Sequence, residues 1–408
     1  MDILKFQISY WIVGMMISRV DSATKEDRYN LYYELFVDSF YNPNLRPVET
    51  DADPLEVWAT FTLISINEIK EKDQTLVAFG YMGLQWTDSF LAWNSTRFNG
   101  LEYIVVPQVR VWRPDIVIGN MVEKTTKLGF DEMPIRLINT GHVTWFPNIL
   151  FQTACDINLQ YYPFDTQVCT IQMNPLVSEI NEIELHLGSN LDPLAEYGQN
   201  GQWELVHLNL EDTRDQYKSI LKFELTLKRR RSFYIMNIIL PVIFLSFMGN
   251  LVFALPAESG EKMSLTITIL LAYVVYLTII SENMPQTSIH ISLLAVYLTI
   301  LVALSSISVL ITTLVLRLHH KDDSIPVSDG IRNLIKFYRR CHCRSPKIVS
   351  IQKRVVTQVS AESVDDIQDP DDNVTWKGLA MSLDAFFFWL YLLITSLSTV
   401  VILLLMLT

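Results

Sequence analysis

The stretch that decides the fold reads CDINLQYYPFDTQVC, residues 155–169. Thirteen residues separate Cys155 from Cys169, and a Tyr-Pro-Phe-Asp run stands near the middle of the loop that they bound. Apolar and polar residues alternate over much of the chain before this loop, whereas long uncharged runs follow it. The loop therefore lies within the β-rich part of the chain, ahead of the apolar runs.

The apolar half contains four uncharged runs in a chain of 408 residues that is 50% hydrophobic. They are residues 233–255, 263–281, 291–316 and 385–407. A helix needs about 20 apolar residues to cross a hydrocarbon layer ~30 Å thick. Because every run is long enough, we expect a multi-pass membrane protein rather than a soluble protein with buried helices.

The N-terminus has the features of a secretory signal. Lys5 precedes a short apolar stretch, residues 8–17, and small residues precede Ala23. We expect residues 1–22 to be a signal peptide and residues 23–232 to be an extracellular domain. Residues 233–316 would then form three spans, 317–382 a cytoplasmic loop and 383–408 the fourth span. This arrangement places both mature termini outside the plasma membrane.

The four cysteines fall into two compartments. Cys155 and Cys169 are the only cysteines of the extracellular segment, where oxidising conditions favour a disulfide. Cys341 and Cys343 lie in the cytoplasmic loop, which is rich in Lys and Arg as such loops are. His342 between them leaves a metal site open as an alternative to free or lipidated thiols.

The extracellular segment reads as a β-sandwich. Alternating stretches such as residues 63–69 and 76–84 predict antiparallel strands of an immunoglobulin-like sandwich, preceded by a short helix over residues 29–40. The net charge of −12 argues against nucleic-acid binding and fits attraction of cations. No nucleophile–base pair, phosphate-binding loop or metal cluster stands out in this segment, so we expect neither an enzyme nor a cofactor.

The loop at 155–169 resembles the signature loop of the Cys-loop receptors, which include the nicotinic acetylcholine, serotonin type 3, GABA-A and glycine receptors. Other segments agree with the nicotinic branch, namely residues 46–48, 85–88, 112–117 and 141–145, together with Asn237 and Pro241. The resemblance implies a ligand-binding sandwich, a four-helix membrane bundle in the lipid bilayer, and five subunits of one or several kinds around a pore. A synaptic location stays open.

One face of the second span is the candidate pore lining. Steps of three or four residues from Glu261 place seven side chains on one helical face: Glu261, Ser264, Thr268, Leu271, Val275, Ile279 and Glu282. Five copies would form carboxylate rings at both ends, with hydroxyl and apolar rings between them. Such rings concentrate cations, replace hydration water and gate by dewetting. Monovalent cations are expected to permeate, and calcium permeation stays open.

The resemblance weakens at the ligand site. Relatives hold an amine between the principal face of one subunit and the complementary face of the next, in an aromatic cage that uses cation–π attraction. Tyr81 and Trp145 are complementary-face candidates. On the principal face Gly119 and Leu176 replace expected aromatic residues, and Tyr217 keeps one aromatic side chain near the hairpin.

Three interpretations of this divergent site stay open. The chain is a complementary subunit of a heteromer, or a homomer that answers to another small extracellular ligand or to pH. A membrane-tethered binding protein is the third. Strand packing is the alternative role for Tyr81 and Tyr217, and core packing for Trp145.

The resemblance also assigns residues that would couple ligand binding to the pore. Arg229 stands at the pre-membrane arginine position and Glu71 at its acidic partner. Phe164 and Asp165 are expected to rest on the linker 283–291, which keeps Pro285. Asn94 begins an Asn-Ser-Thr glycosylation sequon in the extracellular segment, whereas the sequon at Asn373 falls in the cytoplasmic loop.

Overall fold

The computed structural model describes residues 23–50, 52–122, 128–188, 192–257, 260–282, 284–285, 291–322 and 375–407. The expected signal peptide, the cluster at Cys341–Cys343 and the sequon at Asn373 lie outside these residues. The chain divides into two compact units. The sandwich unit holds residues up to 158 and residues 166–230, and the helical unit holds residues 159–165 and 231–408.

The sandwich unit begins with helix α2 (Lys25–Tyr33), which a π-helical turn (Glu34–Asp38) continues. Thr24 caps the helix, since its hydroxyl accepts from the Asp27 amide while the Asp27 carboxylate accepts from the Thr24 amide. This reciprocal cap satisfies donors that the first turn would leave open. The expected N-terminal helix is confirmed, although it begins before residue 29.

Two sheets form the sandwich. The first has the order β3-β5-β6-β2-β1-β9, with β7 also paired to β2, and the second has the order β10-β11-β8-β4. The strands are β1 Leu55–Lys70, β2 Thr75–Thr87, β3 Tyr103–Pro107, β4 Ile116–Ile118, β5 Pro134–Ile138, β6 His142–Trp145, β7 Asn148–Ala154, β8 Thr166–Pro175, β9 Ile183–Leu187, β10 Trp203–Arg214 and β11 Ser219–Arg229. The pair β1–β9 is parallel and the others are antiparallel.

The core of the sandwich unit is aromatic where the sheets meet. The ring of Phe61 in β1 lies 5.2 Å from that of Phe151 in β7 and 5.0 Å from that of Phe223 in β11, between ring centroids. In β11 every second residue is buried, as expected for a strand with one face against a core. A disulfide joins Cys155 to Cys169 and confirms the expected pairing.

A buried polar network fixes three segments of the sandwich unit. The Asp88 carboxylate after β2 accepts from the Tyr41 hydroxyl at 2.6 Å and from the Phe90 amide at 3.1 Å. The Tyr41 oxygen in turn accepts from the Trp112 amide at 2.9 Å. Burial raises the pKa of Asp88 to about 6, although its hydrogen bonds oppose this shift. The motifs around Trp86 and Trp112 therefore meet at one carboxyl group.

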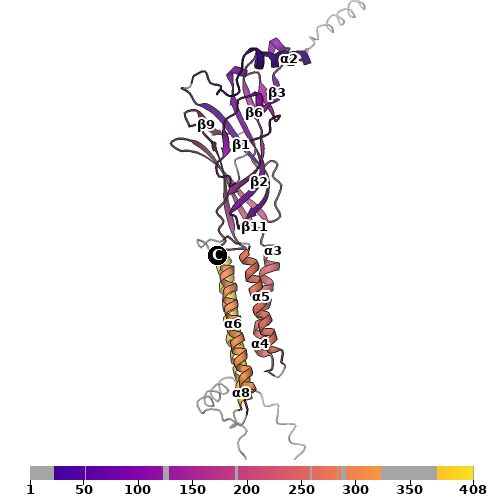
Figure 1. Ribbon diagram of the computed structural model, residues 1–408, viewed down its shortest axis with the longest axis vertical. Coiled ribbons are helices and arrows are strands. Elements are labelled where there is room, and N and C mark those ends of the chain that lie inside the picture. The colour runs from indigo at the N-terminus through magenta and orange to yellow at the C-terminus, as the bar shows by residue number, and fades with distance from the viewer. Residues whose placement is uncertain are drawn as a thin grey trace, which may run out of the picture. The chain divides into compact units, whose positions relative to one another are not determined.

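The described residues of the helical unit include four helices long and apolar enough to cross a membrane (Figure 1). The first span runs from Ser232 to Ala254 and comprises α3 (Ser232–Tyr234), a π-helical turn (Ile235–Ile239) and α4 (Leu240–Ala254). The others are α5 (Lys262–Glu282), α6 (Leu293–His319) and α8 (Trp376–Leu407). Helix α8 begins at Trp376 rather than near 383, because its first turns are amphipathic and precede the uncharged run that was used to predict the fourth span.

The interior of the helical unit combines an apolar core with one ion pair. Tyr273 of α5 and Leu298 and Leu301 of α6 are among its buried residues. Lys262 at the start of α5 is fully buried, and its ammonium donates to the Asp384 carboxylate of α8 at 2.5 Å. Because an unpaired buried charge is strongly destabilising, this pair fixes which side of α5 turns inward.

Gly141, in the turn between β5 and β6, supplies a stability test. Its φ is +83°, and an added Cβ would collide with the carbonyl oxygen of Asp88. Gly100 has a similar φ of +77° but nothing within 4 Å of an added Cβ. Substitution Gly141→Ala should therefore lower the free energy of unfolding by about 3 kcal/mol, and Gly100→Ala by about 1 kcal/mol.

The measurement is the apparent unfolding temperature of the purified protein, followed by tryptophan fluorescence. The two variants share the backbone penalty, so their difference reports the collision alone. Equal shifts for the two variants would contradict the assigned contact.

Candidate pore face and ligand site

Helix α5 has one packed face and one exposed face. Its buried residues are Lys262, Thr266, Ile269, Tyr273 and Ile280. The seven candidate pore residues (Glu261, Ser264, Thr268, Leu271, Val275, Ile279 and Glu282) are all exposed in the single chain. Leu271, at the middle of this exposed stripe, is 61% exposed, although it is one of the most apolar side chains of the helix.

The exposed stripe of α5 changes character along its length. Carboxylates stand at its two ends, hydroxyls follow the first, and Leu271, Val275 and Ile279 come before the last. The Thr268 hydroxyl donates to the Ser264 carbonyl at 2.9 Å, so its oxygen can still act as an acceptor on the helix surface. The arrangement can attract cations at the ends and exclude water between them.

Arg229 and Glu71 are brought together within the sandwich unit. The Arg229 guanidinium at the end of β11 donates to the Glu71 carboxylate at 2.7 Å. Its side chain is 1% exposed and lies over the Trp203 ring, 4.2 Å from the centroid. Removing Glu71 would leave a buried cation without this carboxylate, which makes the pair sensitive to substitution.

The tip of the disulfide-closed loop packs within the helical unit. The Gln160 carbonyl accepts from the Leu293 amide at the start of α6, at 3.0 Å. Arg231 lies over the Phe164 ring at 5.6 Å, and the ring of Tyr162 lies 5.4 Å from that of Tyr234. Asp165 is buried and Pro285 is half-buried. Most of the expected linker partner, residues 283–291, falls outside the described residues.

The principal-face position Gly119 is filled by a neighbouring side chain. The Asn174 carboxamide of β8 lies where a Cβ of residue 119 would stand. An aromatic side chain at 119 is therefore incompatible with this placement of Asn174. Sequence reasoning noticed the missing aromatic residue but not the asparagine that takes its space.

Leu176, the second position that the resemblance assigns to the principal face, has a cationic neighbour. Lys218 donates from its ammonium to the Pro175 carbonyl at 3.1 Å and to the Leu176 carbonyl at 2.8 Å. Tyr217, the residue before Lys218, is 59% exposed, so its ring is not held by packing between strands. Lys218 was not among the predicted site residues, because a lysine in a polar hairpin gives no sequence signal.

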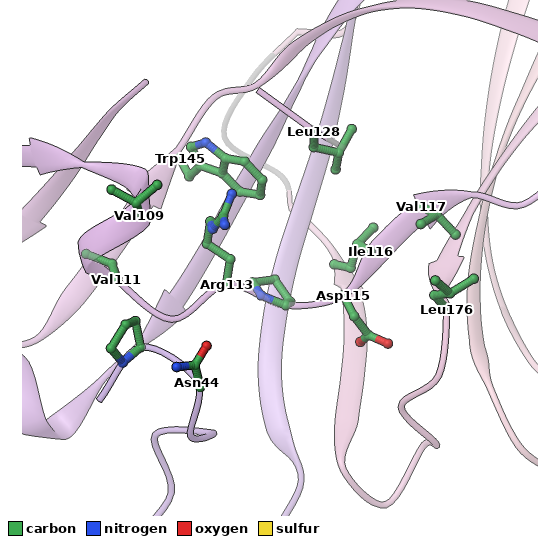
Figure 2. A pocket seen from close by; sticks show the side chains of 12 residues that line it. Asn44, Val109, Val111, Arg113, Asp115, Ile116, Val117, Leu128, Trp145 and Leu176 are labelled. Carbon is green, nitrogen blue, oxygen red and sulfur yellow. The ribbon is translucent and has the colours of Figure 1, made fainter. Parts of the chain in front are cut away.

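Trp145 is not available on the exposed face. It is 2% exposed, and the Arg113 guanidinium lies 5.6 Å from its ring centroid. Both residues line a cavity of about 520 Å³ that also reaches Asp115 and Leu176, and Figure 2 shows Arg113 directed at Trp145. Burial lowers the pKa of Arg113, and the nearby Asp131 carboxylate opposes that shift. This burial fits core packing, and the role of Trp145 at a complementary face stays a prediction.

Phe146 takes the exposed place beside Tyr81. The two rings lie 6.2 Å apart, edge to face, and Phe146 is 41% exposed. Strand β6 alternates half-buried and buried residues and places Val143 and Trp145 inward, so the next residue points outward. That alternation was the signal in the sequence that could have favoured Phe146 over Trp145.

The two remaining candidates are the glycosylation sequon and a possible metal site. Asn94 is exposed and caps a short 3₁₀ turn, and its side-chain oxygen accepts from the Thr96 hydroxyl at 2.8 Å. Within the described residues, no group of three or more His, Cys, Asp or Glu side chains is arranged to hold a metal ion.

Comparisons with known proteins agree with this geometry. Residues 28–231 match the neurotransmitter-gated ion-channel ligand binding domain, and residues 238–346 match the neurotransmitter-gated ion-channel transmembrane region. The acetylcholine receptor subunit delta of Xenopus laevis is 33% identical over 80% of this chain and 66% of its own length. The Gallus gallus delta subunit is 33% identical over 76% of this chain and 64% of its own length.

A third relative is the neuronal acetylcholine receptor subunit alpha-9 of Gallus gallus, 30% identical over 83% of this chain and 71% of its own length. The chain spans just under two thirds of the length of the delta subunits. Both halves match one family in their expected order, with the sandwich and then the spans. The chain therefore belongs to the neurotransmitter-gated ion-channel family, which is a family of ion channels rather than enzymes.

Proposed function

We propose that the chain is one subunit of a pentameric, cation-selective channel of the plasma membrane that opens when a small extracellular ligand binds. Residues 23–232 form the extracellular ligand-binding domain, 233–316 and 383–408 the spans, and 317–382 the cytoplasmic loop. A glycan on Asn94 suits its exposed turn. Both termini of the mature chain lie outside the cell.

The exposed stripe of α5 is the observation that carries this proposal. A lipid-facing helix surface with Glu261, Ser264 and Thr268 would place polar groups in hydrocarbon, which is unfavourable. The same surface suits a water-filled pore shared by several copies. Carboxylates at its ends favour cations over anions, since both rings repel negative ions.

The ligand contribution of this chain is best explained by its complementary face. Half-buried Tyr81 and exposed Phe146 form an aromatic pair there, whereas the principal face has Gly119 and Leu176 in place of aromatic residues. We propose that the chain serves as a complementary subunit in a heteromer. A homomer that answers to a ligand other than a cationic amine is the second candidate, favoured by Lys218 at the principal face.

Gating would depend on the junction residues. Arg229 ends β11 and pairs with Glu71, which follows β1, and the first span begins three residues after Arg229, at Ser232, so strain at this pair can reach the span directly. Phe164 of the loop tip belongs to the helical unit and packs on its core. These contacts are suited to bias a closed–open equilibrium.

The proposed function is tested by voltage clamp of oocytes that express the chain alone or with a nicotinic partner subunit. We expect agonist-evoked cation current from at least one of these combinations. Leu271→Thr should increase spontaneous opening, because a hydroxyl ring wets the constriction. Absence of current from all combinations, despite confirmed surface pentamers, would contradict a channel function.

Glu261→Ala should reduce cation preference. In a tenfold sodium chloride dilution, a cation-selective pore shifts its reversal potential by ~59 mV, and we expect the variant to lose half of that shift or more. Reversal potentials measured under dilution provide the readout. Glu26→Gln, an exposed carboxylate of α2, is the control and should leave the shift unchanged. An unchanged shift in Glu261→Ala would remove Glu261 from the selectivity filter.

Charge exchange tests the Arg229–Glu71 pair. Each single reversal, Arg229→Glu or Glu71→Arg, should reduce maximal current about tenfold or more, because it leaves like charges in a buried site. The double reversal should recover current. Exchange of Glu68 and Lys70, whose side chains are 54% and 37% exposed, is the control and should have little effect. Failure of the double reversal to rescue would count against direct coupling through this pair.

A further inference from the structure

The ammonium of Lys218 is seated on the backbone of the loop that follows β8. It donates to the Pro175 carbonyl at 3.1 Å and to the Leu176 carbonyl at 2.8 Å. A lysine ammonium has three donors, so one N–H is left after these two bonds. The side chain is half-buried, which strengthens its local electrostatic effect relative to a fully solvated lysine.

This ammonium lies at the two principal-face positions that diverge in sequence. Leu176 replaces the expected cage tryptophan, and its carbonyl is one of the acceptors that Lys218 uses. Asn174, whose carboxamide fills the space beside Gly119, donates to the other acceptor, the Pro175 carbonyl, at 2.8 Å. The chain therefore has Gly119 and Leu176 where cage side chains are expected, and a positive charge of its own beside Leu176.

The neighbouring acidic group does not offer a substitute for the cage. The Asp115 carboxylate accepts from the Val177 amide at 2.6 Å, and from the Ser178 amide at 3.0 Å and hydroxyl at 2.7 Å. These three donors occupy the carboxylate within the loop. A ligand amine at this face would thus meet carbonyls already bound to Lys218, a carboxylate already satisfied, and a fixed cation.

We infer that Lys218 is a specificity-determining residue of the principal face, where its ammonium takes the place of a ligand ammonium. The fixed positive charge then weakens the binding of cationic amines at this face. This inference rests on the proposed function only in assuming that a ligand binds at this face. It concerns binding and requires no current.

Because this weakening is electrostatic, the effect of ligand charge on affinity can be separated from the effect of ligand shape. Acetylcholine and 3,3-dimethylbutyl acetate have nearly the same size, but only the first carries a positive charge. Lys218→Met keeps the length of the side chain and removes its charge. We expect this variant to bind acetylcholine about tenfold more tightly than the unsubstituted chain, equivalent to ~1.4 kcal/mol, and to bind the neutral ester with unchanged affinity.

The experiment is a ligand-observed NMR titration of both compounds on the purified full-length protein in nanodiscs. Lys218→Arg keeps the charge and should retain the weak acetylcholine binding. Lys222→Met removes a charge from β11 away from the carbonyls of residues 175 and 176, and should behave like the unsubstituted chain. Pentamer size and the Cys155–Cys169 disulfide confirm that each variant is folded.

Two results would overturn the inference. One is an unchanged acetylcholine affinity in Lys218→Met, and the other is an equal gain for both compounds, which would indicate a change of shape rather than of charge. Failure of the proposed channel function would be seen separately, as silent recordings from a protein whose binding still depends on Lys218.

Discussion

The division of α5 into a packed face and a polar exposed face is the constraint on which the rest of the membrane part depends. A span in lipid must satisfy its polar groups within the protein or in water. The packed face does so through the Lys262–Asp384 pair, whereas Glu261 and Ser264 are exposed in the single chain. The helix is therefore incomplete alone, and association of several copies around water resolves the conflict.

Adjacent residues show how closely this division is set. Glu261 and Lys262 are neighbours in sequence, but one is exposed and the other is fully buried against α8. A rotation of α5 by one residue would bury a carboxylate and present an ammonium on the exposed face. Since an unpaired buried charge is strongly destabilising, the ion pair excludes that alternative and keeps the acidic side chain on the stripe. The Lys262–Asp384 ion pair thus determines both how α5 packs and which charge its exposed stripe carries.

The sequence predicted most of the architecture because its signals were local or periodic. Long apolar runs predict spans, alternation predicts strands, and a helical period predicts that seven side chains share a face of α5. It failed where a nearby side chain decides the outcome. The Arg113 guanidinium over Trp145, the Asn174 carboxamide beside Gly119 and the Lys218 ammonium on Leu176 are contacts made across strands and loops. No spacing rule predicts them, although alternation along β6 pointed to Phe146.

The proposed divergence of the ligand site has a physical explanation when charge is considered together with shape. Loss of an aromatic cage by itself would weaken amine binding by the cation–π contribution, ~0.5–2 kcal/mol for each contact. A fixed ammonium goes further, because it repels a cation and occupies the backbone acceptors that would otherwise receive one. The Tyr81–Phe146 pair on the other face carries no such charge. Two faces of one chain can thus differ in the sign of ligand they tolerate, which is what an asymmetric assembly requires of a subunit that contributes to a ligand site from one side only.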